Sequence, residues 1–284
     1  MTDSKSFTFK GAVVWITGAS SGIGAALAQE AARRGAKLVL SARRETQLQA
    51  VKNSCIEAGC AGDNILVLPL DVEQHDSMPA AVERVHNTFG HIDLLLNNAG
   101  LSQRALCINT DMSVYRKLVD VDLLGQIALT KAVLPLMIAR GSGTISVTAS
   151  VAGKIGAPLR TGYCAVKHAV MGFFDALRVE VAHQGINVIT IVPGSIRTDV
   201  ARNAMMGDGS IHGESDEAIE AGMDVDDCAR VIADGMAAGV EEIEVGTGPE
   251  MQLLGMKRND PVATFRLLEK TAADLMQRKT IKVD

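Results

Sequence analysis

The chain has few aromatic residues, no paired cysteines and no excess of positive charge. Its 284 residues include two tyrosines, one tryptophan and six phenylalanines. Its five cysteines, an odd number without a C-x-x-C pair, argue against a disulfide framework or a structural zinc site and favour a reducing compartment. The 28 Lys and Arg residues against 33 Asp and Glu residues leave a net charge of −5, so we expect no nucleic-acid partner.

Long hydrophobic runs are also missing. Apolar stretches such as Ala132–Ala139 are far shorter than the ~18 residues that a membrane-spanning helix needs. The first residues, Met1–Lys10, lack the apolar core of a signal peptide. The six histidines form no metal-binding motif. We therefore expect a cytoplasmic protein with no transmembrane segment and no metal site.

The residues that are present predict an α/β fold. Short β-rich segments alternate with segments of helical period, which predicts right-handed crossovers and a parallel sheet covered on both faces. No linker divides the chain, so we expect one doubly wound domain over residues 8–250. The strands are expected at residues 12–17, 37–41, 65–70, 92–96, 143–148, 187–192 and 242–245, and the helices between them at 22–34, 45–58, 76–89, 113–139, 162–183 and 224–238.

Two segments depart from this alternation. Asp199–Met223 is rich in Gly, Met and acidic residues and has no strong period, which predicts a mobile excursion. Pro261–Arg278 has apolar residues on one helical stripe and predicts one more helix. Residues 251–284 are therefore expected to form a C-terminal helical extension of the same domain.

A glycine-rich loop, Thr17–Gly24, joins the first strand to the first helix. Glycine allows a tight turn and lets a pyrophosphate approach the helix N-terminus, where free N–H groups favour anions. The spacing G-x-x-x-G-x-G meets the common dinucleotide fingerprint only approximately. The residues expected to bind a dinucleotide are Gly18, Ser20, Ser21, Gly22, Ile23 and Gly24.

The same loop also fits the G-x-S-x-G elbow of serine hydrolases. A hydrolase elbow needs an oxyanion loop and strands before it, and here it would follow the first strand. Hydrolysis is therefore a remote alternative.

Arg43 follows the second strand, at the position where NAD enzymes carry an acidic residue that binds the ribose. An arginine there suits a 2′-phosphate, so NADP is favoured over NAD. It also remains open that Arg43 and Arg44 are only a solvated start of a helix.

Tyr163 and Lys167 lie four residues apart on an expected helix and so share one face. A cation near a phenol favours the phenolate, and such a tyrosine can exchange a proton with a carbonyl or alcohol oxygen. Tyrosine and lysine also share helix faces without a function. Ser150 strengthens the catalytic interpretation, because it follows a strand whose end should border a ligand site.

Taken together, these motifs resemble the short-chain dehydrogenase/reductase family. The motifs are Thr17–Gly24, Asn97-Asn98-Ala99-Gly100, Ser150, Tyr163-x-x-x-Lys167 and Pro193-Gly194-x-Ile196-x-Thr198. The resemblance implies a seven-stranded Rossmann-like sheet. It also implies that Tyr163 is the acid/base and contacts the cofactor, that Lys167 holds the nicotinamide ribose, and that Ser150 orients the substrate.

Further cofactor contacts follow only from the resemblance. It places Asn98, Ala99 and Gly100 along the adenosine side of the cofactor, Asp71 and Val72 against adenine, and Pro193, Ile196 and Thr198 near the carboxamide or phosphates. Two of these residues also suit structural roles, because Asp71 could cap the next turn and Asn98 could hold two strands together.

Asp122 departs from the family pattern. Family members usually carry asparagine there, where it helps a water-linked proton relay to the lysine. A buried carboxylate beside Lys167 would slow that relay or change its pH dependence, unless the main-chain carbonyl does the work.

The sequence around the site resembles that of dehydrogenase/reductase members whose animal relatives are membrane-anchored and act on lipophilic carbonyls. The family resemblance implies that residues 199–223 form a substrate lid, with a plain solvent loop as the alternative. It also implies a homodimer or homotetramer built on Ser113–Ala139 and Gly162–His183.

We predict hydride transfer between NADP(H) and an apolar carbonyl or secondary alcohol. The alternative, which only Asp122 favours, is an NADP-binding, redox-responsive interaction protein with little turnover.

Overall fold

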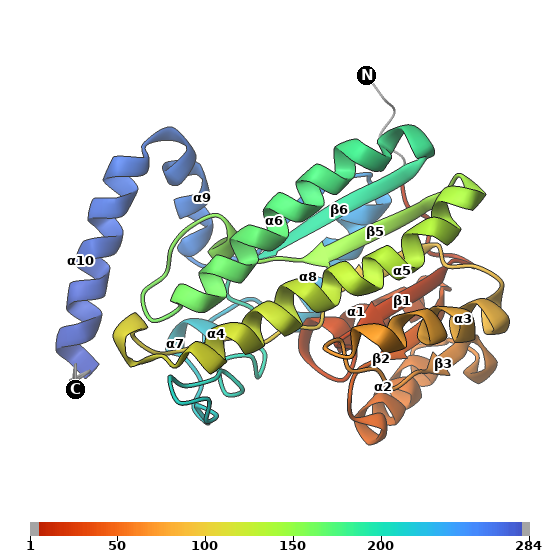
Figure 1. Ribbon diagram of the computed structural model, residues 1–284, viewed down its shortest axis with the longest axis horizontal. Coiled ribbons are helices and arrows are strands. Elements are labelled where there is room, and N and C mark those ends of the chain that lie inside the picture. Colours follow the sequence, from red (N-terminus) through yellow and green to blue (C-terminus); the bar gives the residue numbers. More distant parts are fainter. Residues whose placement is uncertain (1–5, 280–284) are drawn as a thin grey trace.

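A parallel sheet of seven strands forms the middle layer of the molecule (Figure 1). The structure is a computed structural model that describes residues 6–279, so residues 1–5 and 280–284 of the expected N-terminus and extension lie outside it. The strand order is β3-β2-β1-β4-β5-β6-β7, which confirms the predicted doubly wound fold. The strands are β1 (Val13–Thr17), β2 (Lys37–Ser41), β3 (Ile65–Val67), β4 (Leu94–Asn97), β5 (Gly143–Thr148), β6 (Ile186–Pro193) and β7 (Glu242–Val245).

Two separate hydrophobic cores lie on the two faces of the sheet, and several strands supply alternate residues to each. On β1, Val14 and Ile16 face one core while Val13 and Trp15 face the other. Both sets are almost completely buried, because helices cover each face of the sheet. The continuous apolar strands of the sequence are thus a direct consequence of a doubly covered sheet.

Helices α1 (Gly22–Arg33), α2 (Glu45–Glu57) and α8 (Val225–Ala237) pack on one face of the sheet. Helices α3 (Met78–Phe89), α5 (Gly125–Arg140) and α6 (Thr161–Val181) pack on the other, where α5 and α6 run side by side along the sheet (Figure 1). Each helix therefore buries the stripe that its sequence period predicts.

The helix expected over residues 113–139 is divided in three. Helix α4 (Met112–Val119) leads into a π-helical segment at Asp120–Leu124, and α5 follows. The π segment inserts a wider turn, a feature frequent at functional sites. Gly125 follows it where a Cβ would lie only 2.7 Å from the carbonyl oxygen of Val72. Periodicity alone did not predict this break, since apolar spacing continues through it.

Residues 199–223, the segment expected to form a lid and called the lid below, contain one short helix, α7 (Glu217–Glu220), and are tied to the body of the protein. Met205 pairs through its backbone with Ser102 and Arg104, at 2.8 Å in both hydrogen bonds. Asp216 forms ion pairs with two arginines. The segment is therefore irregular in secondary structure but held at both of these points.

The C-terminal extension contains the helix expected over Pro261–Arg278 and, before it, a second helix that was not expected. Helix α9 (Glu250–Asn259) precedes α10 (Pro261–Lys279), and Asp260 between them has φ −144° and ψ 86°. A residue before proline is pushed out of the helical region, so Asp260-Pro261 ends the first helix. Helix α10 extends away from the sheet (Figure 1).

Helix Met112–Arg140 is long and apolar enough to cross a membrane, although no spanning segment was expected. We expected no such helix because we counted only continuous apolar residues. This helix contains a few charged residues, but its mean hydropathy is still high. In the structure 44% of its apolar window is buried, and it packs on α3, α6 and the sheet. The core helix of a protein that never enters a membrane passes the same test.

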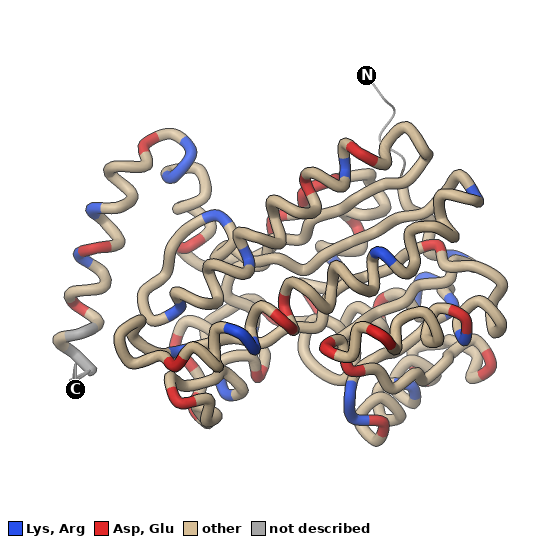
Figure 2. The backbone as a smooth tube through the Cα atoms, viewed as in Figure 1, with Lys and Arg blue, Asp and Glu red and all other residues tan. Residues whose placement is uncertain are grey.

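Charged residues of both signs are interspersed along the chain (Figure 2). Among the residues that the structure describes, no group of three or more His, Cys, Asp or Glu side chains could hold a metal ion.

Candidate active site

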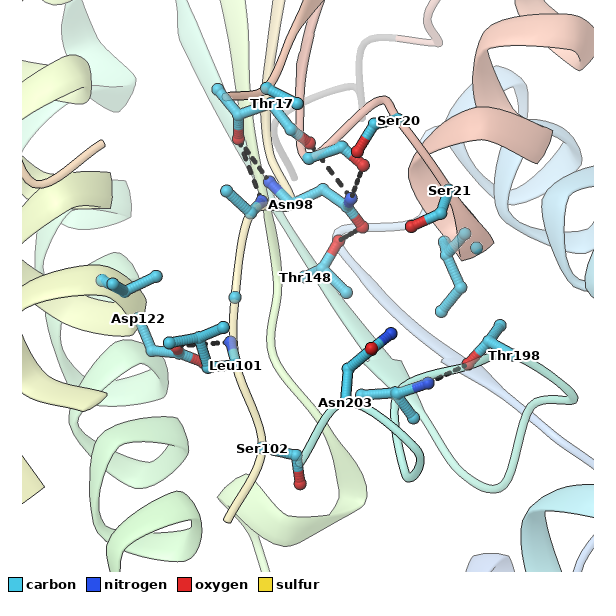
Figure 3. A pocket seen from close by; sticks show the side chains of 18 of the residues that line it. Thr17, Ser20, Ser21, Asn98, Leu101, Ser102, Asp122, Thr148, Thr198 and Asn203 are labelled. Atoms are coloured by element: carbon cyan, nitrogen blue, oxygen red, sulfur yellow. Dashed lines mark hydrogen bonds between the residues drawn. The ribbon is translucent and has the colours of Figure 1, made fainter. Parts of the chain in front are cut away.

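A cavity of about 580 Å³ lies at the carboxyl ends of the strands (Figure 3). It includes the gap between β1 and β4, where successive strands run to opposite sides of the sheet. Crevices at such switch points bind ligands in open parallel sheets. The cavity volume falls in the range of small-molecule sites.

Nearly all of the predicted site residues line this one cavity. Gly24 is the exception. The cavity is lined by the predicted residues Gly18, Ser20, Ser21, Gly22, Ile23, Arg43, Asp71, Val72, Asn98, Ala99, Gly100, Asp122, Ser150, Tyr163, Lys167, Pro193, Ile196 and Thr198. Their roles remain predictions, but the tertiary structure brings together residues from across the whole domain.

The glycine loop turns as its sequence predicts. Gly18 and Gly22 have φ of 64° and 55°, a backbone region that glycine adopts without strain. A Cβ on Gly24 would lie 2.4 Å from the carbonyl oxygen of Gly18. Gly24 therefore allows α1 to pack tightly on the loop rather than lining the cavity.

Asn98 joins two strands, as its structural alternative predicted. Its amide donates to the carbonyl oxygen of Thr17 at 3.1 Å and accepts from the hydroxyl of Thr148 at 3.1 Å (Figure 3). The hydroxyl of Thr17 accepts from the backbone N–H groups of Asn98 and Ala99. These bonds hold the ends of β1, β4 and β5 together at the cavity wall.

At the far end of the cavity lie two arginines and a carboxylate. Arg43 and Arg44 are exposed, and their side chains form no hydrogen bond or ion pair with the described residues. Asp71 Oδ1 accepts from the backbone N–H of Glu73 at 3.2 Å, so it caps a turn while also lining the cavity. The two guanidinium groups are available to an anionic ligand.

Ser150 and Tyr163 both have a hydroxyl proton free for a ligand. Ser150 Oγ accepts from the backbone N–H of Ala152 at 3.1 Å and donates to none of the described residues. The Tyr163 hydroxyl has no hydrogen-bond partner among them. The Tyr163 ring lies between two cations, with Lys167 Nζ 5.6 Å and Arg160 Cζ 6.0 Å from its centroid.

Lys167 and Asp122 form a buried ion pair. Lys167 Nζ lies 3.3 Å from Asp122 Oδ2 and donates to the carbonyl oxygen of Thr148 at 3.1 Å. Asp122 Oδ1 accepts from the backbone N–H of Leu101 at 2.7 Å (Figure 3). Asp122 Oδ2 accepts no well-directed hydrogen bond, so its contact with Lys167 is chiefly electrostatic.

Burial and charge act against each other in this pair. Burial raises the pKa of Asp122 above its ordinary value, and the charge of Lys167 and the Leu101 N–H only partly oppose it. Burial alone would lower the pKa of Lys167, but the Asp122 carboxylate beside it outweighs that effect and raises the pKa. Lys167 is therefore held in its charged form.

Several cavity residues were not predicted. Thr148 could have been found, because it ends a strand at the same edge of the sheet as Ser150. Ser102 and Asn203 carry no sequence signal, since Ser102 lies in the loop after β4 and Asn203 lies in the irregular lid. The further lining residues from the lid are Asp199, Val200, Ile211 and Ile219.

The hydrolase alternative lacks a base. Histidine is absent from the residues that line the cavity within the described chain, so Ser20 has no imidazole partner there.

The cavity fits a dinucleotide cofactor. Its glycine loop leaves the N-terminus of α1 open, and free guanidinium groups lie at one end. A Cβ on Gly100 would lie 2.9 Å from Asp122 Oδ2 and 3.4 Å from Lys167 Nζ, so a larger residue at this point of the cavity wall would crowd the ion pair. The free hydroxyls of Ser150 and Tyr163 lie at the cavity as well.

Comparisons with known proteins agree with this geometry. A family model described as short chain dehydrogenase matches residues 12–208. "Dehydrogenase/reductase SDR family member 7" from Homo sapiens is 44% identical over 241 residues, covering 84% of this chain and 70% of that protein.

Two solved structures share the fold. A short-chain dehydrogenase/reductase from Burkholderia phymatum in complex with NAD has a TM-score of 0.78 at 24% identity, over 89% of this chain and 95% of its own. A short-chain dehydrogenase from Burkholderia cenocepacia in complex with NADP has a TM-score of 0.76 at 22% identity, over 92% and 99%. Both cofactors thus occur on this fold.

Proposed function

Because the chain belongs to the short-chain dehydrogenase/reductase family, an oxidoreductase family on an NAD(P)-binding fold, we propose that it transfers a hydride between NADP(H) and an apolar ketone, aldehyde or secondary alcohol. The observation that carries the proposal is the convergence of the Ser150 and Tyr163 hydroxyls with a buried, charged Lys167 on one cavity.

When bound, the nicotinamide cofactor supplies or accepts the hydride at the substrate carbon. In the reducing direction Tyr163 donates its hydroxyl proton to the carbonyl oxygen, which becomes an alcohol, and water later restores that proton. Ser150 donates a hydrogen bond to the same oxygen and stabilises its developing negative charge. Oxidation of an alcohol reverses each proton movement.

Lys167 acts on Tyr163 through its charge. Its ammonium lies 5.6 Å from the phenol ring and stabilises the phenolate that forms when the proton leaves. Asp122 keeps the ammonium charged and in place. We propose that Asp122, where the family usually carries asparagine, anchors Lys167 rather than relaying the proton through a neutral amide.

We propose NADP as the preferred cofactor. Arg43 and Arg44 both line the cavity and have no carboxylate partner, so either can pair with a 2′-phosphate. For the substrate, the lid supplies Val200, Ile211 and Ile219 to the cavity, which favours an apolar carbon skeleton.

The decisive experiment compares the wild type with Tyr163→Phe on a panel of apolar ketones, assayed with NADPH and with NADH. Tyr163→Phe should lower the turnover number about 10²- to 10⁴-fold and leave NADPH affinity unchanged, because it removes only the proton donor. Tyr115→Phe is the matched control. Tyr115 is the other tyrosine of the chain, its hydroxyl lies 2.9 Å from Thr161 Oγ1, and it does not line the cavity.

The alternative of a non-catalytic interaction protein makes a different prediction. If the wild type and Tyr163→Phe are equally inactive on every ketone while both bind NADPH, the enzyme proposal fails and the interaction protein remains.

We propose further that the chain is a cytoplasmic homo-oligomer and that Met112–Arg140 does not cross a membrane. This helix carries the Asp122 carboxylate that pairs with Lys167, and lipid insertion would break that pair. Cell fractionation with a carbonate wash tests the proposal, because an integral segment would keep the protein in the membrane pellet.

A further inference from the structure

The lid contributes two polar residues to the cavity lining, Asp199 and Asn203, and the proposed reaction uses neither. Past Asp199, the lid residues that line the cavity are apolar except for Asn203. The amide of Asn203 points into the cavity (Figure 3) and forms no hydrogen bond with any described residue. An amide offers two donor hydrogens and an acceptor oxygen, all of which are available here to a ligand.

The backbone at Asn203 is fixed on both sides. The N–H of Asn203 donates to the carbonyl oxygen of Asp199 at 2.9 Å. Ala204 and Met205, which follow, are buried, and Met205 pairs with Ser102 and Arg104. The side chain of Asn203 is therefore presented from a held position.

A second anchor holds the lid near its other end. Asp216 lies 2.6 Å from Arg104 and 2.8 Å from Arg160, and the three side chains are between 12 and 18% exposed. Arg160 also donates to the hydroxyl of Ser102 at 2.7 Å. The anchor thus connects the lid to the loop after β4 and to the start of α6.

We propose that Asn203 is a specificity-determining residue that forms a hydrogen bond with a second oxygen of the substrate. The inference rests on the proposed function and deepens it. The preferred substrates are then apolar ketones or secondary alcohols that carry another carbonyl or hydroxyl group. Val200, Ile211 and Ile219 contact the carbon skeleton, while the exposed Asn203 forms a hydrogen bond with the added oxygen, which a substrate without that oxygen cannot make.

The test uses two matched probes, cyclohexanone and cyclohexane-1,4-dione, with NADPH. The kcat/KM of each probe is measured for the wild type, Asn203→Ala and Asn203→Leu. For each protein we take the ratio of kcat/KM for the dione to kcat/KM for the ketone. Comparing this ratio between proteins removes the difference in intrinsic reactivity of the two probes. Both variants should lower this ratio about 3- to 10-fold, the range of one neutral hydrogen bond.

Ser210→Ala is the control, because Ser210 is an exposed lid residue that does not line the cavity and should leave the ratio unchanged. An equal loss on both probes would show that Asn203 has only a structural role and would overturn the inference. A weaker NADPH affinity with an unchanged ratio would assign Asn203 to the cofactor instead.

Failure of the proposed function has its own signature. In that case the wild type reduces no ketone or dione of the panel with either cofactor, and this inference falls with it. Loss of only the ratio effect, with turnover intact, refutes the inference and leaves the proposed function standing.

Discussion

Asp122 and Lys167 are both almost inaccessible to water, yet both are ionisable. The two charges of a buried ion pair attract each other strongly in the protein interior, but both lose their hydration. The net contribution of the pair to stability is therefore small. Its value here lies in placing the ammonium beside Tyr163. Removing one partner is different from replacing both, because the other charge is then left buried and alone.

Asp122→Asn should make the free energy of unfolding depend differently on pH. Burial raises the pKa of Asp122 above its ordinary 3.8, so this carboxyl favours folding below that pH and loses the advantage as pH rises through its folded value. The variant lacks this carboxyl and so does not lose its contribution to stability as pH rises. Burial also lowers the pKa of the unpaired Lys167, which likewise makes the stability of the variant rise with pH. The unfolding free energy of the variant minus that of the wild type should therefore increase as the pH rises above about 4.

Urea unfolding of both proteins at several pH values measures this difference. A difference that stays constant or decreases with pH would contradict the assigned burial of the carboxylate. The pH profile of kcat measured in parallel reports whether the same change reaches the catalytic step.

Arg43 offers the residue-scale test of cofactor choice. Arg43→Ala should raise the Kd of NADPH about 10- to 100-fold, the range of a hydrogen bond to a charged group, and leave the Kd of NADH nearly unchanged. Quenching of protein fluorescence measures both constants. Arg116→Ala is a matched control, since Arg116 is exposed and lies outside the cavity. Equal effects on the two cofactors would argue against a 2′-phosphate contact.

At the scale of elements, the π segment and the lid shape the site. The π segment at Asp120–Leu124 places Asp122 against Lys167, although the helix continues on both sides. The lid has almost no regular structure, and its position depends on backbone pairing at Met205 and on the ion pairs of Asp216. Neither feature follows from a hydrophobic period.

Asp216→Asn should loosen the lid. The substitution leaves Arg104 and Arg160 without their shared carboxylate, and their mutual repulsion then disfavours the closed arrangement. We expect KM for ketones to rise about tenfold, within the range for a partly buried ion pair, with the Kd of NADPH unchanged. Trypsin should also cleave faster at the exposed Arg202 within the lid.

Asp208→Asn serves as the control for that experiment, because Asp208 is an exposed lid carboxylate whose partner is Ser210. Unchanged KM and unchanged cleavage in Asp216→Asn would show that the backbone pairing alone holds the lid.

At the scale of the whole molecule, apolar side chains remain exposed on the face formed by α5 and α6. Leu136 is 39% exposed and Val179 is 75% exposed. The expected homo-oligomer would bury this face against a second copy. It would also cover the exposed side of Met112–Arg140, whose apolar window is 44% buried in one chain.

Leu136→Glu combined with Val179→Glu should therefore yield a monomer in sedimentation experiments, because four like charges would face each other in a symmetric dimer. Val231→Glu with Val240→Glu is the control, since these residues are also exposed apolar side chains, at 39% and 42%, on α8 and the loop after it. A wild type that already sediments as a monomer would refute the proposed assembly.

The sequence by itself determined the layered α/β fold, the seven strands and the identity of most cavity residues. Alternating strands and helices admit few arrangements, and motifs at strand ends must meet at one edge of a parallel sheet. Only the tertiary structure revealed the π segment, the helix α9 and the placement of Asn203. It also showed Gly24 to be a packing residue. These features depend on contacts between segments distant in the chain, which no local pattern records.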